Sequence, residues 1–479
     1  MNQSNNKLSF REKFGYSLGD LSANLVFQTL MMFLLFFYTD VYGIEPGVAG
    51  TIIFVGGIIG AAFNIIMGAI ADRTSTRWGK FRPWILWTSL PFCFIAVLTF
   101  TTPDLGYSGK IIYASVTYLL LLLVYSANNL PYSALSGVMT GDMVERTSLS
   151  SYRFVAVTIA QFITLVLLLP LVDFFGEGNE RVGYQKTIML FAIIAFIFFI
   201  ITFLTSKERI EPDPAQKTSI KNDLSDLIRN RPWIILFLLT MFLFIGLALR
   251  GAMLVYYFKD YVSEIELSKL TYFLGFREAK WISNEANLGY SFFNMVGIIG
   301  TLIGIASSRS LAKRYGKRDA FLFGLTIAAC LQALFVLYSP AQIRLMFITF
   351  LIIGFFYGIT TPLLWAMIGD VVDYSEWKNF RRATGMVFSA IIFGLKAGLG
   401  LGGALAGYLL STYGYDSDII IQSHRVHVGI RLSISVYPAI FFLIGCSLLL
   451  FYKIRKKTEL RIQFELEERR NNKNNKIYV

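Results

Sequence analysis

The sequence contains few charged residues and very little cysteine or histidine. Asp, Glu, Lys and Arg make up 16% of the 479 residues, whereas soluble domains usually contain about a quarter. Three cysteines and two histidines, without a CxxC or HExxH motif, exclude a disulfide framework and the common zinc sites. We therefore expect no metal and no cofactor. Cys93, Cys330 and Cys446 are interpreted as small apolar residues within helices.

Apolar residues dominate the rest of the chain. They make up 55% of it, aromatic residues make up 16%, and the mean hydropathy is +0.57. A single water-soluble core cannot bury that much apolar surface, so we predict an integral membrane protein surrounded by lipid. The net charge of +13 lies in short clusters between apolar runs. Membrane topology accounts for these clusters better than a nucleic-acid partner does, because no nucleic-acid-binding motif accompanies them.

Twelve apolar segments are long enough to cross a bilayer, which requires about 20 mostly apolar residues in a helix. They predict an all-α integral membrane fold with twelve transmembrane helices. Turn residues and charges place the segments near residues 15–42, 47–72, 82–101, 110–139, 151–173, 186–205, 233–261, 287–309, 317–338, 343–371, 380–412 and 430–453.

Lysine and arginine gather in alternate connections between these segments. Because positively charged loops stay in the cytoplasm, both termini are predicted to be cytoplasmic in a bacterial inner membrane. The N-terminus is polar and leads into a long helix without a cleavage site, as expected of a cytoplasmic start. On the opposite side, residues 259–286 form a long predicted external loop. The orienting clusters include Arg73, Arg77, Lys80, Arg82, Lys207, Arg209, Lys217, Lys221, Arg309, Lys313, Arg314, Lys317, Lys453 and Arg455.

The longest polar interruption, residues 206–232, lies almost at the middle of the chain. We interpret it as a cytoplasmic linker between a six-helix bundle at 1–205 and a second one at 233–453, with a solvated charged tail at 454–479. Internal similarity supports this division, because the chain after the second helix, GAIADRTSTRWGKFRPW, is echoed after the eighth by GIASSRSLAKRYGKRDA. Two six-helix repeats are typical of transporters that rock around a central site.

Four ionisable residues stand out inside the predicted spans: Asp20, Arg153, Arg250 and Lys396. Such residues are costly in a membrane and are functional candidates by default. Lys396 either pairs with a structural acid or serves substrate binding or coupling. Arg153 is either interfacial or a donor to sugar hydroxyls. For Arg250, a structural ion pair and a functional role are equally favoured. Asp20 is a candidate coupling carboxylate, although an ion pair with an arginine of a neighbouring helix is favoured.

Neutral polar residues add hydrogen-bonding groups to the first and fourth helices. Asn24, Asn129 and Ser133 are candidate ligands for a polyhydroxylated substrate, and hydrogen bonding between helices is the equal alternative. The glycines around Lys396 are interpreted as helix-packing positions.

Charged residues at the cytoplasmic helix ends predict a gate that breaks and re-forms ion pairs during alternating access. One part follows the second helix, where an acid and several bases surround a tight turn. Its partners lie at the ends of the fourth and tenth helices. The predicted gate residues are Asp72, Arg73, Arg77, Lys80, Asp142, Glu145, Asp370, Asp373, Glu376 and Arg382.

Five blocks of sequence carry a family resemblance over nearly the whole chain. They are LGDLSANLVFQTLMMFLLFFYTDVYG, DRTSTRWGKFRPWIL, NLPYSALSGVMTGDMVERTSLSSYRF, IGDVVDYSEWKNFRRATGM and FGLKAGLGLGGALAGYLLSTYGY. With these blocks the chain resembles the glycoside-pentoside-hexuronide cation symporters of the major facilitator superfamily. The resemblance implies that superfamily's fold of two six-helix bundles, a sugar-contacting Arg153 and an essential Lys396.

The resemblance also shows where this chain departs from the family pattern. Asn24 and Asn129 stand where a well-known member has sugar-binding aspartates, and Gly60 and Asn64 stand where that member has the acids of its sodium site. Without those carboxylates a sodium site lacks its hard oxygen ligands. The resemblance therefore argues against sodium coupling and leaves two alternatives, proton coupling through Asp20, which is favoured, and no coupling at all.

These observations lead to the hypothesis of a monomeric secondary transporter that imports a sugar or sugar derivative. The buried cations favour an anionic substrate such as a uronate. An exporter or flippase of a drug or lipid is the alternative, because the same fold hosts both activities. A membrane-embedded enzyme or receptor is not expected, since the sequence contains no catalytic dyad and no signalling domain.

Overall fold

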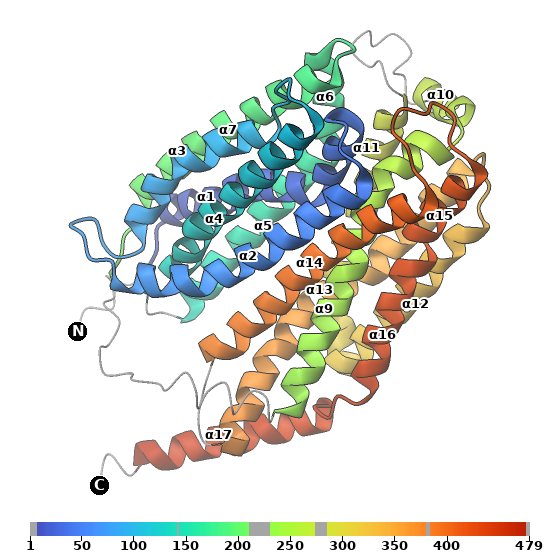
Figure 1. Ribbon diagram of the computed structural model, residues 1–479. Helices are drawn as coiled ribbons and strands as arrows, with labels where there is room; N and C mark the ends of the chain where they lie inside the picture. Colours follow the sequence, from blue (N-terminus) through green and yellow to red (C-terminus); the bar gives the residue numbers. More distant parts are fainter. Residues whose placement is uncertain (1–6, 141–142, 210–229, 274–284, 380–383, 476–479) are drawn as a thin grey trace. The chain divides into compact units, whose positions relative to one another are not determined.

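A computed structural model describes residues 7–140, 143–209, 230–273, 285–379 and 384–475. Over these ranges every regular element is a helix, apart from one isolated β-bridge between Thr76 and Gly79. Twelve stretches of the described chain are long and apolar enough to cross a membrane. The prediction of an all-α fold with twelve membrane spans is confirmed (Figure 1).

Several spans contain more than one helical element. In the first half of the chain, the elements are α1 (Phe10–Phe36), η2 (Phe37–Val41), α2 (Pro46–Arg73), α3 (Arg82–Thr99), α4 (Tyr107–Met139), α5 (Met143–Phe162), η3 (Ile163–Leu167), α6 (Leu168–Gly176) and α7 (Glu180–Thr205). In the second half, they are α9 (Arg231–Tyr256), η4 (Tyr257–Tyr261), α10 (Glu264–Phe273), α11 (Glu285–Tyr315), α12 (Lys317–Leu334), η5 (Phe335–Leu337), α13 (Ile343–Asn379), α14 (Thr384–Tyr413), α15 (His424–Ile434), α16 (Val436–Leu450) and α17 (Lys456–Asn475).

Several boundaries differ from the predicted ones, and three of them concern polar sequence. The tenth span continues to Lys378, and the twelfth begins at His424, because the polar sequences at these ends remain helical although they are not continuously apolar. The predicted external loop at 259–286 contains a short helix, Glu264–Phe273. Its residues 274–284 lie outside the described chain.

Contacts divide the chain into two compact units. Unit 1 comprises residues 1–215, 251–294 and 403–430, and unit 2 comprises residues 216–250, 295–402 and 431–479. In unit 1, α1 packs against α5 and α7, and α3 packs against α4 and α7. Leu21 and Leu25 of α1 meet Ala156 and Ala160 of α5 in a small apolar cluster. This packing places polar residues of α1 beside α4 and α5.

Unit 2 has a large apolar core in which α12 packs against α13 and α16. The C-terminal helix α17 lies across the end of α13 (Figure 1). It contributes Ile462 and Leu466 to this core, with exposed fractions of 2% and 5%. The expectation of a solvated tail is therefore wrong for this face of α17.

Glycines allow close helix crossings within unit 2. A Cβ atom on Gly304 of α11 or on Gly358 of α13 would collide with the backbone of the opposite helix. On α14, a Cβ on Gly398 or Gly402 would stand 2.5 Å from a backbone carbonyl oxygen of α9. The interpretation of the glycines around Lys396 as packing positions is confirmed, because only small residues permit such approach.

Candidate functional site

Asp20 of α1 and Arg153 of α5 form an ion pair inside unit 1. Arg153 Nε donates a hydrogen bond to Asp20 Oδ2 at 2.7 Å. The aspartate side chain is 7% exposed and the arginine side chain is 25% exposed, so the pair is only partly screened by solvent. Both residues lie within membrane spans. The favoured prediction for Asp20, an ion pair with an arginine of a neighbouring helix, is confirmed.

Two stacked tyrosines lie against this ion pair. The rings of Tyr16 and Tyr132 are 4.5 Å apart between centroids and nearly parallel, at 13°. The guanidinium carbon of Arg153 is 5.8 Å from the Tyr16 centroid and 5.2 Å from the Tyr132 centroid. These distances are within the range of attractive cation–π contacts. The tyrosines therefore help to fix the guanidinium beside Asp20.

Amides and a hydroxyl surround the charged pair on α1 and α4. Asn24 is partly buried and donates its side-chain amide to the backbone carbonyl of Asp20 at 2.8 Å. Asn129 and Ser133 are partly buried and four residues apart, hence on one face of α4. Their side chains make no hydrogen bond to another residue of the described chain. Asn128, in contrast, donates to Thr88 Oγ1 at 2.9 Å and links α4 to α3.

Gly60 and Asn64, the two positions where the resemblance implies that sodium-site acids are missing, lie on α2. Asn64 donates its side-chain amide to the carbonyl of Gly60 at 3.0 Å. A Cβ at Gly60 would contact Leu122 at 3.2 Å. Among the residues that the structure describes, no group of three His, Cys, Asp or Glu side chains is arranged to hold a metal ion.

Lys396 belongs to unit 2, where it occupies α14 between two helix-packing glycines. Its side chain is partly buried. Since α14 is held tightly to α9 on either side of Lys396 through Gly394 and Gly398, the lysine has a well-defined position in the helix. Its participation in substrate binding or coupling stays a prediction.

Arg250 of α9 contacts two uncharged side chains within unit 2. It donates to Gln332 Oε1 at 3.1 Å, and its guanidinium is 5.3 Å from the centroid of Phe350. The Gln332 amide in turn donates to the carbonyl of Ile434. Arg250 therefore ties α9 to α12 and, through Gln332, to α15, which supports its structural interpretation.

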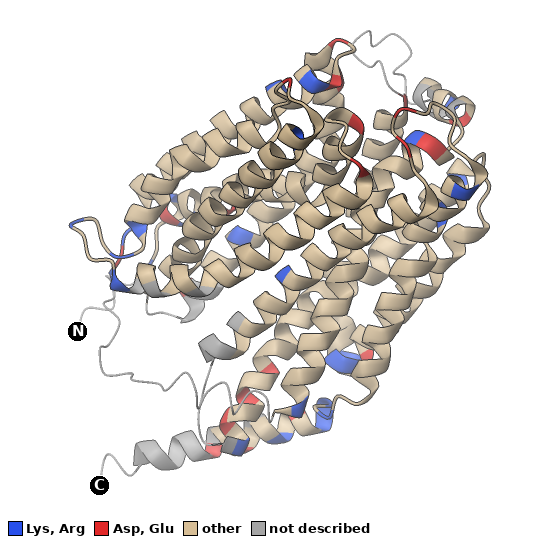
Figure 2. Ribbon diagram, in the orientation of Figure 1, with Lys and Arg blue, Asp and Glu red and all other residues tan. Residues whose placement is uncertain are grey.

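Most charged residues gather toward the helix ends (Figure 2). Among the predicted gate residues of unit 1, Glu145 is 2.9 Å from Lys13 Nζ. The turn that contains Lys80 is fixed by Glu208, whose carboxylate accepts N–H groups of Lys80, Phe81 and Arg82 at 2.8 to 2.9 Å. Arg73 and Arg77 are exposed.

The predicted gate residues of unit 2 lie on α13. Asp370 is 2.6 Å from Lys317 Nζ, and the same lysine is 2.9 Å from Glu459 of α17. Asp373 and Glu376 are partly buried on α13. The pairs of Glu145 with Lys13 and of Asp370 with Lys317 thus each join residues of one unit. Three gate residues cannot be placed: Asp142 and Arg382 lie outside the described residues, and the side chain of Asp72 is not described.

Tyr16, Tyr132, Glu208 and Lys317 were not among the predicted site residues. A signal existed for the tyrosines, because Tyr16 precedes Asp20 by four residues and Tyr132 follows Asn129 by three, which places them on shared helix faces. No pattern in the sequence indicated that Glu208, at the start of the linker, caps the turn after α2.

The fold and the site define a membrane transporter. The family model described as "MFS/sugar transport protein" matches residues 15–279 and 279–456. The chain belongs to this family, and its resemblance to the glycoside-pentoside-hexuronide cation symporters is confirmed.

Individual relatives and a solved structure agree with this assignment. The inner membrane symporter YicJ of Escherichia coli K12 is 38% identical over 439 residues, which cover 91% of this chain and 90% of the relative. The isoprimeverose transporter of Lactiplantibacillus pentosus is 33% identical, over 97% of this chain and 92% of the relative. The crystal structure of a D-xylose-proton symporter matches with a TM-score of 0.63 at 12% identity, over 94% of this chain and 99% of that one. The last likeness shows the fold alone.

Proposed function

We propose that the protein imports a glycoside, pentoside or hexuronide across the bacterial inner membrane by alternating access, together with a proton. The observation that carries the proposal is the ion pair of Asp20 and Arg153 held against two stacked tyrosines within membrane spans. Relatives named as a symporter and as an isoprimeverose transporter support symport and the substrate class. The distribution of Lys and Arg supports cytoplasmic termini.

Arg153 is the proposed anchor for the sugar. Its guanidinium has five N–H donors in a planar fork, which matches adjacent hydroxyls or a carboxylate, and one of them is used on Asp20. The tyrosine rings offer a flat apolar surface of the kind that lines ligand sites with few polar groups. Asn129 and Ser133 supply hydrogen-bonding groups on the neighbouring helix. By resemblance, Lys396 is proposed to serve substrate binding or coupling.

The same ion pair provides a physical route for coupling. In the present arrangement Arg153 compensates the charge of Asp20. A substrate that takes over the guanidinium leaves an ionised carboxylate without its partner in apolar surroundings, which is strongly unfavourable. Uptake of a proton by Asp20 removes that cost. Binding of substrate and binding of the proton therefore favour each other.

Uptake into oriented membrane vesicles tests this proposal. A panel of labelled neutral glycosides, pentosides and hexuronides is offered with a proton gradient, a sodium gradient or no gradient. We expect one substrate class to accumulate with the proton gradient, and we expect Asp20→Asn to abolish accumulation while equilibrative exchange persists. Asp104→Asn, which changes an exposed carboxylate in the loop after α3, serves as the matched control.

Each alternative has its own result. Uptake of no sugar above empty vesicles contradicts the proposed substrate class, and accumulation driven by sodium contradicts the proposed coupling ion. Extrusion from preloaded vesicles in place of uptake favours the exporter.

A further inference from the structure

The ends of α1 and α9 carry related short sequences. Residues 37–41 read FYTDV and residues 257–261 read YFKDY, and each forms a π-helical turn. In this alignment Asp40 corresponds to Asp260, and Lys259 stands where the first half has Thr39. π-helical turns are rare in proteins, and those that occur often lie at functional sites. The two halves of the chain thus place a similar irregular turn at corresponding helix ends, with a lysine in only one of them.

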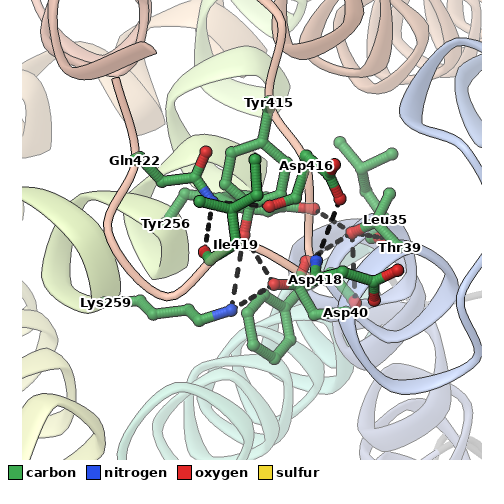
Figure 3. Close-up of polar contacts among 11 residues, drawn as sticks. Leu35, Thr39, Asp40, Tyr256, Lys259, Tyr415, Asp416, Asp418, Ile419 and Gln422 are labelled. Carbon is green, nitrogen blue, oxygen red and sulfur yellow. Dashed lines mark hydrogen bonds and ion pairs between the residues drawn. The ribbon is translucent and has the colours of Figure 1, made fainter. Parts of the chain in front are cut away.

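Asp40 is the centre of a hydrogen-bonded cluster at this end of unit 1 (Figure 3). Its Oδ1 atom accepts from Lys259 Nζ and, at 2.6 Å, from the Tyr415 hydroxyl. Its Oδ2 atom accepts from Thr39 Oγ1 at 2.6 Å. The Asp40 side chain is 2% exposed, whereas that of Lys259 is 40% exposed. The carboxylate is therefore enclosed by its partners, while the lysine is accessible to solvent.

Aromatic residues support the cluster from inside unit 1. The Tyr256 hydroxyl is 2.6 Å from Thr39 Oγ1, and its ring meets the Tyr415 ring edge-on at a centroid distance of 5.1 Å. Lys259 Nζ lies 5.6 Å from the centroid of Phe36. We call Thr39, Asp40, Tyr256, Lys259 and Tyr415 together the Asp40 latch.

The loop after α14 positions the tyrosine of the latch. The side-chain amide of Gln422 donates to the carbonyl oxygens of Asp416 and Ile419, at 2.6 and 2.9 Å, and closes this loop. Burial raises the pKa of Tyr415 above its ordinary value, and the negative charge of Asp40 raises it further. The phenol therefore keeps its proton and donates a hydrogen bond to the Asp40 carboxylate.

The latch joins segments that are far apart in the chain: the end of the first span, the end of the seventh and the connection after the eleventh. The first span belongs to one predicted six-helix half and the other two segments belong to the second. We propose that the Asp40 latch holds the external end of the transporter closed and opens once in each cycle to admit substrate from outside. Its assignment to the external side, and the cycle itself, rest on the proposed function.

The chemistry of the latch suits repeated opening. Each of its hydrogen bonds exchanges for a bond to water when the segments separate, so the net gain from each bond is small. The Lys259 side chain is 40% exposed in the closed arrangement, so it keeps part of its hydration, which lowers the cost of parting it from Asp40. An apolar contact of similar size lacks this compensation, because opening would expose apolar surface to water.

Cysteine labelling tests the latch without any substrate. Val255 is 3% exposed and lines a small cavity together with Phe36 and Lys259. A single cysteine at this position, in a chain whose three natural cysteines are replaced by serine, is treated with a membrane-impermeant maleimide in right-side-out vesicles. The variants are Asp40→Asn, Tyr415→Phe and the exchange of charges by Asp40→Lys with Lys259→Asp.

We expect Asp40→Asn to speed labelling about tenfold, since hydrogen bonds to charged groups contribute more than neutral ones. Tyr415→Phe is expected to speed labelling less, and the charge exchange is expected to return the rate toward that of the parent. Lys269→Gln, which breaks an exposed pair with Glu266 on α10, is the control at the same end of the molecule and is expected to change nothing.

Equal labelling of Asp40→Asn and the parent overturns the proposal, as does a charge exchange that labels as fast as Asp40→Asn. A second cysteine at Ala329, which is 0% exposed in the core of unit 2, reports unfolding. If the cysteine at position 329 is labelled in Asp40→Asn, that variant is unfolded. The labelling rate at position 255 is then compared between the parent and Tyr415→Phe, which loses only a hydroxyl, and equal rates overturn the proposal. Labelling that changes only in inside-out vesicles contradicts the external assignment. Failure of sugar uptake leaves the labelling result intact and contradicts the proposed function alone.

Discussion

Tyr16 and Tyr132 each donate a hydrogen bond from the phenol to the backbone carbonyl of the other, both at 2.8 Å. This reciprocal arrangement fixes α1 to α4 at the level of the stacked rings. Gly19 makes it possible, because a Cβ there would stand 2.6 Å from the Tyr132 ring. Since Arg153 lies over both rings, the position of the proposed sugar anchor depends on this aromatic pair.

Tyr16→Phe is predicted to destabilise the protein while leaving the ring stack in place. Tyr16 is 0% exposed, so loss of its hydroxyl removes a buried hydrogen bond to the Tyr132 carbonyl, at a cost of about 0.5–1.5 kcal/mol. Thermal unfolding in detergent measures the effect. Tyr315→Phe, at a tyrosine that is 53% exposed, is the control. An unfolding temperature equal to that of the parent in both variants contradicts the structural role of the reciprocal bonds.

The ion pair of Asp20 and Arg153 predicts a characteristic double-mutant cycle. Arg153→Gln leaves a carboxylate that is 7% exposed without its cation, and we expect a loss of about 2–4 kcal/mol. Adding Asp20→Asn is expected to recover much of this stability, because two neutral amides can hydrogen-bond to each other. Sugar uptake is expected to remain absent in the double variant, since both charges are gone. Recovery of uptake together with stability contradicts the proposed role of Arg153 in binding.

The crossing of α11 and α13 predicts opposite effects for two glycines of one helix. Gly358→Ala is expected to destabilise by about 1–3 kcal/mol, because overpacking forces the helices apart and the new Cβ meets the backbone of Thr301. At Gly369, a Cβ meets nothing within 4 Å. Gly369→Ala is therefore expected to stabilise by up to about 1 kcal/mol through helix propensity. Equal changes in the unfolding temperature contradict the close crossing.

The sequence predicts the transmembrane architecture well and the polar contacts poorly. Apolar run length indicates a span without reference to any partner, which is why all twelve segments were found. The latch around Asp40 depends on residues from three distant segments, and no pattern in the sequence indicates that these segments meet. Tyr16 and Tyr132 were two among 25 tyrosines. The polar start of the twelfth span at His424 was missed because amphipathic sequence lowers mean hydropathy without preventing a helix.

The C-terminal helix offers the clearest test of a prediction that the structure overturned. If α17 is part of the core of unit 2, then Ile462→Ala, at a side chain that is 2% exposed, is expected to cost about 2–4 kcal/mol through lost burial and an unfilled cavity. Phe464→Ala, two residues along and 69% exposed, is expected to have little effect on stability. The comparison of their unfolding temperatures decides between the two arrangements, because a solvated tail would tolerate both changes equally.

Docking of α17 also places Glu459 beside Lys317. We therefore expect Ile462→Ala, by loosening the helix, to weaken that ion pair as well, and Glu459→Gln to destabilise the parent more than it destabilises Ile462→Ala.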